Sequence, residues 1–356
     1  MGLRESRVVD VLHCFIGATR DQVLHVLQSD ARRAHSGPDL RLAIPWLLTR
    51  RHKIWWLNMK TPWPGVILIT GASGRVARRT AELLARDGHI LRLMTRSPQR
   101  APELPEAETV RGDFSETATL ESAFEGVSAA LVVSASGEPG ERAQLHRNAF
   151  QAAARARVEH LVYLSMQGAA PDSKYPFSRD HYLSEQYLFA TGLPCTVLRN
   201  AFYIDMFLEK FDAGGVVRGP AQQGRGAFVS REDVAQTAAA ALRRQPGGIH
   251  DVTGPEALSV ADIARRLSIL AGRPLRYEDE AGEAARDRLS SLEPLAWRVD
   301  LSVGWFEAIA AGELQRTSDT VLRFTGTAPL TLEDYFRAFP ELLRALHEGL
   351  DQITAG

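Results

Sequence analysis

The chain is 356 residues long, with 45% hydrophobic and 24% charged residues and a formal net charge of −1 at pH 7. These values predict a soluble globular protein with a sizeable core and argue against nucleic acid or an acidic surface as the main partner. The two cysteines, Cys14 and Cys195, are far apart, which argues against a disulfide framework and a cysteine metal site. The apolar run 8–18 is too short to span a bilayer. We therefore expect a cytoplasmic protein with no membrane span and no metal.

The first 58 residues differ in pattern from the rest of the chain. Residues 42–58, LAIPWLLTRRHKIWWLN, are basic and aromatic, as in segments that lie on an anionic membrane or dock on a partner. Met59, however, stands just before the first predicted strand, where an alternating strand and helix pattern begins. We favour an N-terminal extension over residues 1–58, either disordered or the product of a misassigned start, and leave the docking interpretation open.

Residues 66–77 carry the strongest motif. The uncharged β-branched run 66–69 predicts a strand buried on both faces of a parallel sheet. Gly71 allows a tight turn, Gly74 lets the backbone approach a pyrophosphate, and Ala77 is small enough for the next helix to pack on the strand. The N-terminus of that helix favours anionic phosphate. The motif therefore predicts a dinucleotide cradle, with a merely structural turn as the alternative.

The end of the second strand, predicted over residues 90–94, decides which dinucleotide fits. A site for NAD needs a carboxylate about 20 residues beyond the glycines, whereas a site for NADP needs a cation for the 2′-phosphate. Arg96 stands there, with no Asp or Glu between residues 90 and 99. NADP(H) is therefore favoured over NAD(H). The alternative is an arginine that simply extends into solvent.

Strand and helix patterns alternate from Met59 onward, which predicts an α/β fold with a Rossmann-like doubly wound parallel sheet. Ligands of such sheets bind at the carboxyl ends of the strands, so residues after strands 109–111, 129–133 and 161–164 are expected to face the cleft. Asp113 either contacts the adenine or caps the following helix. The residues expected at this edge are Asp113, Phe114, Ser134, Ala135, Ser136 and Ser165.

Several motifs fall in register with one known family. These are GASGRVA, the GDF after the third strand, LHRNAFQAAARARVEHLVYLSMQG, HYLSEQYLFATGLPCTVLRNAFYIDMF and TLEDYFRAFP. Together they resemble the NmrA-like group of atypical short-chain dehydrogenases, and within it the bacterial NADPH-dependent quinone reductases, over residues 64–340.

The resemblance implies a Rossmann domain over residues 59–200 and a smaller C-terminal α/β substrate lobe, interleaved with the sheet, over residues 201–356. It also implies NAD(P)H-dependent reduction of a quinone-like or other conjugated small-molecule acceptor, or alternatively a cofactor-sensing regulator that acts through a protein partner. A homodimer is left open. The residues expected around the cofactor are Gly71, Ala72, Ser73, Gly74, Arg75, Val76 and Arg96, and those expected around the nicotinamide and substrate are His181, Asn200, Phe202 and Tyr203.

The chain lacks the usual proton relay of short-chain dehydrogenases, a tyrosine four residues before a lysine. In that pair the ammonium lowers the pKa of the phenol, which then donates a proton. What remains is chemistry in which the cofactor reacts and the protein orients the acceptor. His181 and Asn200 are the candidate catalytic residues. Glu185, also expected near the substrate, lies one helical turn from His181, where its carboxylate could hold the imidazole in one tautomer. The equally expected alternative is a capping histidine on an exposed turn with a solvated glutamate.

Beyond residue 200 the sequence is less informative. The glycines in 214–220 predict a loop that serves as a lid. Residues 259–271 have the apolar spacing of a packed helix, and the charged stretch 278–300 predicts a pair of surface helices.

Overall fold

The structure is a computed structural model that describes residues 65–344. Its centre is a seven-stranded sheet with the order β3-β2-β1-β4-β5-β6-β9, in which every neighbouring pair is parallel. The predicted Rossmann-like doubly wound sheet is therefore confirmed. The strands of this sheet are β1 (Val66–Thr70), β2 (Leu91–Thr95), β3 (Ala107–Arg111), β4 (Val127–Val132), β5 (His160–Met166), β6 (Cys195–Asn200) and β9 (Gly248–Val252).

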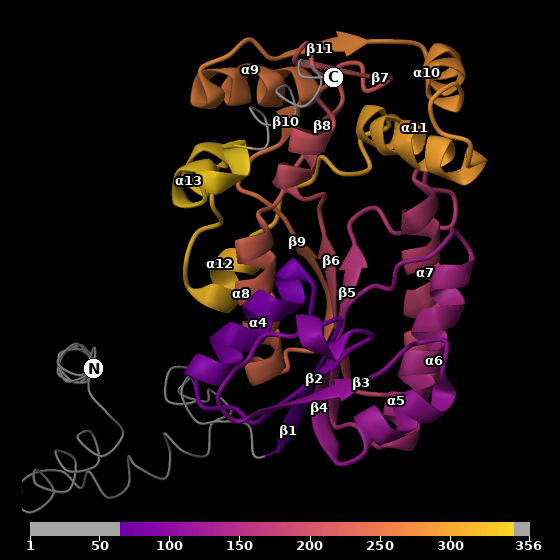
Figure 1. Cartoon of the computed structure of the whole chain (residues 1–356), viewed down its shortest axis with the longest axis vertical. Coiled ribbons are helices and arrows are strands. Elements are labelled where there is room, and N and C mark those ends of the chain that lie inside the picture. The colour runs from indigo at the N-terminus through magenta and orange to yellow at the C-terminus, as the bar shows by residue number, and fades with distance from the viewer. Residues whose placement is uncertain (1–64, 345–356) are drawn as a thin grey trace, which may run out of the picture. The chain divides into compact units, whose positions relative to one another are not determined.

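Helices cover both faces of the sheet, as Figure 1 shows. On one face lie α4 (Arg75–Arg86), α8 (Arg231–Arg244) and α12 (Thr320–Thr325), and on the other α5 (Thr117–Phe124), α6 (Glu141–Arg155) and α7 (Pro176–Ala190). Strand β1 shows why the sheet is buried on both sides. Ile67 and Ile69 belong to the apolar core under α4 and α8, while Leu68 belongs to the core under α5 and α6. Side chains of a strand alternate between faces, so an uncharged run supplies both cores.

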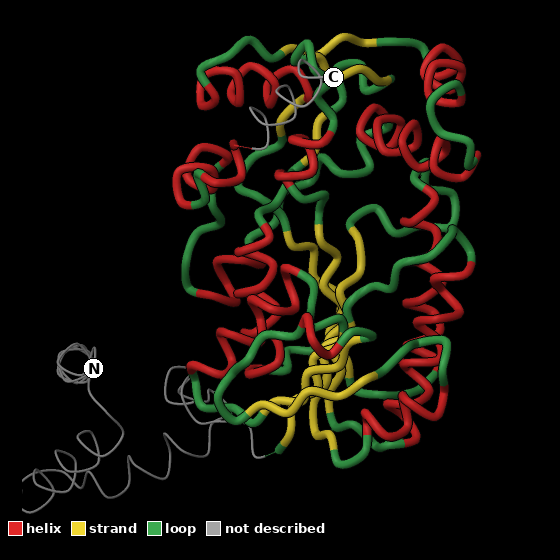
Figure 2. The backbone as a smooth tube through the Cα atoms, viewed as in Figure 1, coloured by secondary structure: helices red, strands yellow, loops and turns green. Residues whose placement is uncertain are grey.

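A second lobe lies beyond the carboxyl ends of the strands (Figure 2). It contains one parallel and one antiparallel pair of short strands around an aromatic core in which Phe202, Phe207 and Trp305 are buried. Its elements are η3 (Ile204–Glu209), β7 (Val216–Gly219), β8 (Arg225–Gly226), β10 (Leu258–Ser259), α9 (Val260–Ala271), β11 (Arg276–Asp279), α10 (Gly282–Ser290), α11 (Ala296–Ala310) and α13 (Leu332–Ala338). A short helix, η2 (Pro98–Arg100), follows β2 in the first lobe.

The chain after residue 200 is interleaved with the sheet, because α8, β9 and α12 return to the Rossmann sheet after η3, β7 and β8 have entered the second lobe. Residues 214–220 are not a lid. Strand β7 pairs with β11, and a Cβ on Gly219 would lie 2.3 Å from the Phe306 ring, so this segment is fixed in the second lobe.

Residues 1–58 lie outside the part of the chain that the structure describes. Within residues 65–344, no helix has the length and apolar character needed to cross a bilayer.

Candidate functional site

The glycine turn after β1 forms a cradle of backbone N–H groups. Gly71 has a φ of +62°, a conformation that glycine adopts without strain. The N–H of Gly74 donates to the Gly71 carbonyl oxygen at 2.8 Å, and a Cβ on Gly74 would lie only 3.2 Å from that oxygen. No side chain caps α4, and its first turn holds no acidic residue. The N-terminus of α4 therefore keeps its positive field for an anion.

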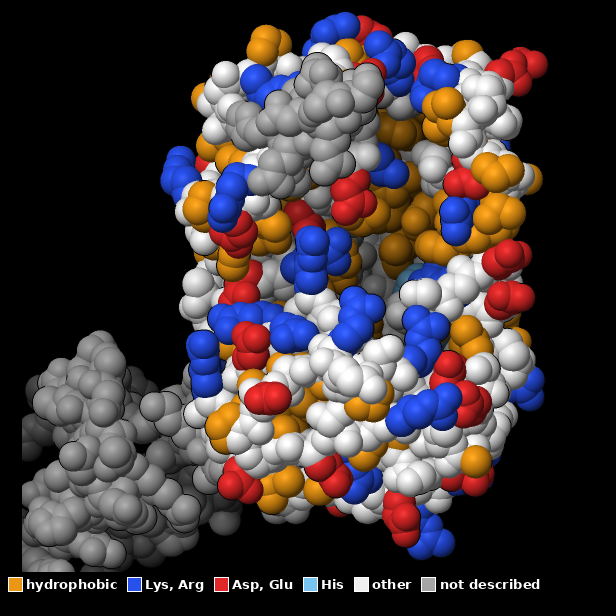
Figure 3. Space-filling model, viewed as in Figure 1, with side chains coloured by type: hydrophobic (Ala, Val, Ile, Leu, Met, Phe, Trp, Pro, Cys, Tyr) orange, Lys and Arg blue, Asp and Glu red, His pale blue; other side chains and the backbone are white. Residues whose placement is uncertain are grey.

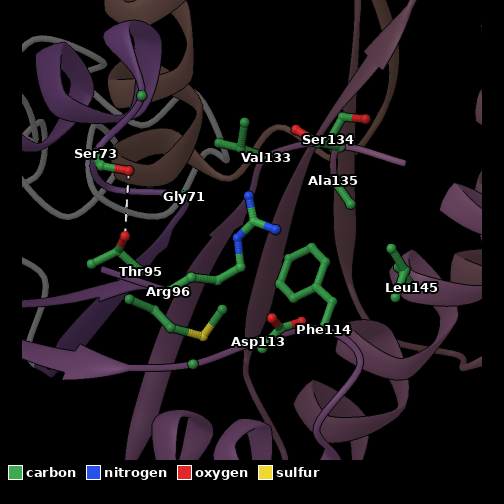
Figure 4. Close-up of a pocket in the computed structure, with 14 residues that line it drawn as sticks. Gly71, Ser73, Thr95, Arg96, Asp113, Phe114, Val133, Ser134, Ala135 and Leu145 are labelled. Atoms are coloured by element: carbon green, nitrogen blue, oxygen red, sulfur yellow. Dashed lines mark hydrogen bonds between the residues drawn. The ribbon is translucent and has the colours of Figure 1, made fainter. Parts of the chain in front are cut away.

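A cavity of about 260 Å³ opens at the carboxyl ends of β1 to β4. Figure 4 shows its side chains converging from the glycine turn and from the ends of β2, β3 and β4. Nine of the residues predicted to bind the cofactor line it: Gly71, Ser73, Gly74, Arg96, Asp113, Phe114, Ser134, Ala135 and Ser136. Five lining residues were missed: Met94, Thr95, Gly112, Val133 and Leu145.

Arg96 and Asp113 give this cavity its charge. Arg96 is exposed, and its guanidinium extends across the cavity in Figure 4. The Asp113 carboxylate accepts hydrogen bonds from the N–H and the hydroxyl of Ser115, at 2.9 and 2.8 Å. These bonds, with a smaller contribution from Arg96, lower the pKa of Asp113. Asp113 therefore lines the cavity and holds the turn before α5. It does not cap that helix, whose N-cap is Glu116 with no side-chain cap bond, and its contact with the adenine stays a prediction.

Other motif residues serve the fold. Ala72 is fully buried and its N–H donates to the Met94 carbonyl oxygen at 3.1 Å, while Val76 packs in the core. Neither Ala72 nor Val76 lines the cavity, and their predicted part in cofactor binding stays a prediction. Arg75 donates to Asp205 at 3.0 Å, and Arg231 approaches the same carboxylate at 2.7 Å. These two contacts join the starts of α4 and α8 to η3 of the second lobe.

Ser165 and Glu185 form a buried hydrogen-bonded pair. Ser165 lies outside the cavity, and its hydroxyl donates to Glu185 at 2.5 Å. Glu185 has no exposed surface and forms a two-point ion pair with Arg199, at 2.9 and 2.6 Å. A buried carboxylate paired in this way has a structural role. The Glu185 carboxylate thus bonds Ser165 and Arg199 and not His181, which corrects its expected role as the partner of the imidazole. Contact of Ser165 with the cofactor and of Glu185 with a substrate stays a prediction.

His181 is instead held by Tyr163. The Tyr163 hydroxyl lies 2.8 Å from Nδ1 of His181 and 3.1 Å from Nδ1 of His146. Arg142 lies beside Nε2 of His181, at 3.4 Å from Nη2. Burial, with Arg142 as a second cause, lowers the pKa of His181 well below its usual value, so the ring is neutral. Burial raises the pKa of Tyr163.

The remaining candidates lie where the second lobe begins. Asn200 ends β6 with 4% of its surface exposed, and its Oδ1 has no hydrogen-bond partner among the described residues. Phe202 stacks on Trp305, with ring centroids 5.2 Å apart, inside the aromatic core. The Tyr203 ring is half-buried under the Arg231 guanidinium, 4.1 Å from its centroid. Of these residues, Asn200 has the free polar atom that a ligand could use.

Comparison with known proteins identifies the family. A model of the NAD(P)H-binding family matches residues 71–245. A (4-alkanoyl-5-oxo-2,5-dihydrofuran-3-yl)methyl phosphate reductase from Streptomyces griseus is 35% identical over 237 residues, which cover 64% of this chain and 82% of that protein. The chain belongs to this family of NAD(P)H-binding oxidoreductases. The predicted membership in a family of NAD(P)H-binding reductases is thereby confirmed.

Two further relatives extend the match. An NAD(P)H azoreductase from Xenophilus azovorans is 28% identical over 77% of this chain and 97% of its own length. One similar solved structure is that of an NADPH-dependent quinone oxidoreductase from Escherichia coli, complexed with NADPH. It superposes on this chain with a TM-score of 0.70 at 27% identity, and the match covers 77% of this chain and 99% of the Escherichia coli chain. The chain is an NAD(P)H-dependent oxidoreductase.

The cradle fits the cofactor of this oxidoreductase family. Three features match the phosphates and ribose of a dinucleotide: the open N-terminus of α4, the tight glycine turn in which a Cβ on Gly74 would be crowded, and the cationic side chain of Arg96 on the cavity wall. Among residues 65–344, no three His, Cys, Asp or Glu side chains are placed to hold a metal ion.

Sequence reasoning missed Arg142, His146 and Tyr163. A signal for the first two was present, since they lie four residues apart and therefore on one face of α6. Tyr163 carried no such signal because it sits in the apolar run of β5.

Proposed function

We propose that this oxidoreductase uses NADPH to reduce quinone-like and other conjugated acceptors without an ionisable tyrosine. The observation that carries the proposal is the state of Tyr163. It is the tyrosine in contact with His181, and burial raises its pKa. Neither lysine of the described segment, Lys174 or Lys210, is among the charged groups that act on this pKa. The cation that acts on Tyr163 is Arg142, and its lowering of the pKa is smaller than the rise caused by burial, so the phenol stays a poor proton donor.

The preference for NADPH rests on the end of β2. Thr95 ends the strand, where a site for NAD would present a carboxylate. The Thr95 hydroxyl donates to Ser73 at 3.3 Å, which ties the strand end to the glycine turn (Figure 4). Arg96 follows on the cavity wall, within reach of a 2′-phosphate bound there. These features support NADPH over NADH.

The acceptor class rests on what a hydride produces. NADPH bound in the cavity supplies a hydride, and with it two electrons. A quinone that takes up this hydride becomes a conjugated oxyanion, which a proton from water completes to the hydroquinone. A simple ketone gives an alkoxide, which needs a proton donor at once. The names of the three relatives point to conjugated acceptors, since a quinone, an azo compound and an alkanoyl dihydrofuranone are all conjugated.

The face shown in Figure 3 offers a place for such an acceptor. It is hollowed between α11 and the end of β5, and hydrophobic side chains gather on the wall of this hollow, while Lys and Arg side chains flank it on the side of the Rossmann sheet. We assign His181 and Asn200 to polar contacts with the acceptor, since each carries a polar atom at the junction of the two lobes.

A panel of acceptors tests the proposal. Steady-state oxidation of NADPH should be rapid with quinones and slow with simple ketones of similar size. Reduction of the ketones at the same rate as the quinones would overturn the acceptor assignment, and equal affinities for NADPH and NADH would overturn the cofactor assignment. The relatives that are named as reductases favour this function over a cofactor-sensing regulator.

A further inference from the structure

We propose that Tyr163 and His146 act as positioning residues, which keep the single ring proton of His181 on Nε2. The inference rests on the proposed function, in which His181 contacts the acceptor. The inference gives a role to Tyr163 and His146, which do not line the cofactor cavity.

The direction of the hydrogen bonds is fixed at one end by the backbone. The N–H of Ala135 lies 2.8 Å from Nε2 of His146. A backbone N–H can only donate, so Nε2 of His146 must carry a lone pair. Burial and the neighbouring Arg142 lower the pKa of His146 to about 3, which keeps this ring neutral. A neutral imidazole has one N–H, and that of His146 is therefore on Nδ1.

The next step passes from His146 to Ser184 and Tyr163. Nδ1 of His146 lies 2.8 Å from the Ser184 hydroxyl oxygen and 3.1 Å from the Tyr163 oxygen. Ser184 gives its own proton to the Asp180 carbonyl oxygen at 2.7 Å, so it can receive the Nδ1–H of His146. Tyr163 cannot donate to His146, because Nδ1 is already protonated.

The phenol proton of Tyr163 then needs an acceptor. Tyr163 has no exposed surface, so bulk water does not reach its hydroxyl. Ser184 acts on the pKa of Tyr163, and its hydroxyl oxygen keeps a second lone pair. Among the described residues, however, the Tyr163 hydroxyl has hydrogen-bond geometry only towards Nδ1 of His146 at 3.1 Å and Nδ1 of His181 at 2.8 Å, and the first of these is already protonated. Donation to His181 gives the buried phenol proton a partner. His181 must then carry its own proton on Nε2.

Arg142 explains why His181 needs such a constraint. Its Nη2 lies 3.4 Å from Nε2 of His181, and a guanidinium can only donate. Without Tyr163, the arginine would favour the other tautomer, with the lone pair of Nε2 facing it. Arg142 is itself held by the Ala135 carbonyl oxygen at 2.9 Å and by the Phe177 ring, 3.7 Å from its Cζ.

The favoured tautomer places two donors side by side. Nε2–H of His181 and the guanidinium of Arg142 are neighbours that cannot bond to each other, and Nη1 of Arg142 has no acceptor among the described residues. Two adjacent donors suit an oxygen that gains negative charge, as the acceptor oxygen does in the proposed hydride transfer. Tyr163 thus works behind the histidine, whereas the usual short-chain dehydrogenase tyrosine is the donor itself.

The experiment reads the tautomers directly. The full chain labelled with ¹⁵N-histidine gives long-range ¹H–¹⁵N spectra, in which protonated and unprotonated ring nitrogens have distinct shifts; His181→Gln and His146→Gln variants assign the signals. We expect His146 to be protonated on Nδ1 and His181 on Nε2. In Tyr163→Phe, His181 should shift to the Nδ1 tautomer while His146 keeps its own. Tyr182→Phe, on the same helix as His181, is the matched control and should leave both unchanged.

Kinetics complete the test. Tyr163→Phe should lower kcat with a quinone by about tenfold, with the KM and the affinity for NADPH unchanged. A wild-type spectrum with His181 protonated on Nδ1 would overturn the inference, and this result does not depend on whether the variant folds. An unchanged His181 tautomer in Tyr163→Phe would overturn it as well. The expected spectra without quinone turnover would contradict the proposed function and leave the tautomer assignment standing.

Discussion

The two parts of the site are built in different ways. The glycine turn between β1 and α4 offers backbone groups to a ligand, and its requirements lie within a few residues. Gly71 has a positive φ, and a Cβ on Gly74 would lie 3.2 Å from the Gly71 carbonyl oxygen. The cluster of Arg142, His146, Tyr163 and His181 is made of side chains from α6, β5 and α7. A backbone site can be recognised from local sequence, whereas a side-chain cluster of this kind becomes visible only when the fold brings its members together.

The largest expected effect is at Glu185, which sequence reasoning assigned to the second part of the site. Removal of its carboxylate in Glu185→Ala leaves Arg199 without its partner and should lower the free energy of unfolding by about 3 to 5 kcal/mol. Urea unfolding measures this. The exposed pair of Arg155 and Glu121 provides the control, and Glu121→Gln should change stability by less than about 0.5 kcal/mol. A stable Glu185→Ala that has lost activity would restore Glu185 as a functional residue.

Acid should weaken the side-chain cluster through His146. Its folded-state pKa is lowered to about 3, whereas the unfolded ring has the ordinary value of about 6.5. The unfolded chain therefore takes up a proton that the folded chain does not, and stability is lost as the pH falls from about 6.5 towards 3, by at most about 1.4 kcal/mol per pH unit. Between pH 7 and pH 5, the free energy of unfolding should fall for both proteins, and the fall should be about 2 kcal/mol smaller for His146→Gln than for the wild type. Equal losses in urea unfolding would show that His146 takes up a proton in the folded state.

Arg96 tests the backbone-built part of the site. Arg96→Ala should weaken NADPH binding by about 1.5 to 3 kcal/mol, the scale of a charge-assisted hydrogen bond, and NADH binding very little. Arg111→Ala, which removes an arginine paired with Glu116 at the end of β3, is the control and should affect neither cofactor. Titrations of the two cofactors measure the difference. A similar loss for NADH would mean that Arg96 contacts a part that both cofactors share.

Smaller effects are expected at His181 and Asn200. In the proposed function, these two side chains orient the acceptor and are not its indispensable proton donor. His181→Ala and Asn200→Ala should therefore each lower kcat/KM with quinones by roughly tenfold. Tyr182→Phe should have almost no effect. A loss of a thousandfold or more in either alanine variant would point to an indispensable proton donor.

The sequence predicted those features that depend on residues close together in the chain. The buried β1 run, the turn at Gly71 and Gly74, and Arg96 after β2 all follow from neighbours in the chain, and the structure places the two glycines and Arg96 on one cavity. The spacing of Glu185 from His181 was correct, but it did not reveal Arg199, which arrives from β6 and takes the carboxylate. For the same reason the partner of His181 could not be foreseen, since Tyr163 reaches it from β5.

The central claim is that this reductase transfers a hydride to conjugated acceptors without an ionisable tyrosine. The most direct measurement is NADPH oxidation by the wild type and by Tyr163→Phe, each with one quinone and one simple ketone of similar size. We predict rapid reduction of the quinone, negligible reduction of the ketone, and a variant that is slower with the quinone yet still active. Brisk reduction of the ketone that is abolished in Tyr163→Phe would contradict this claim and make Tyr163 the proton donor.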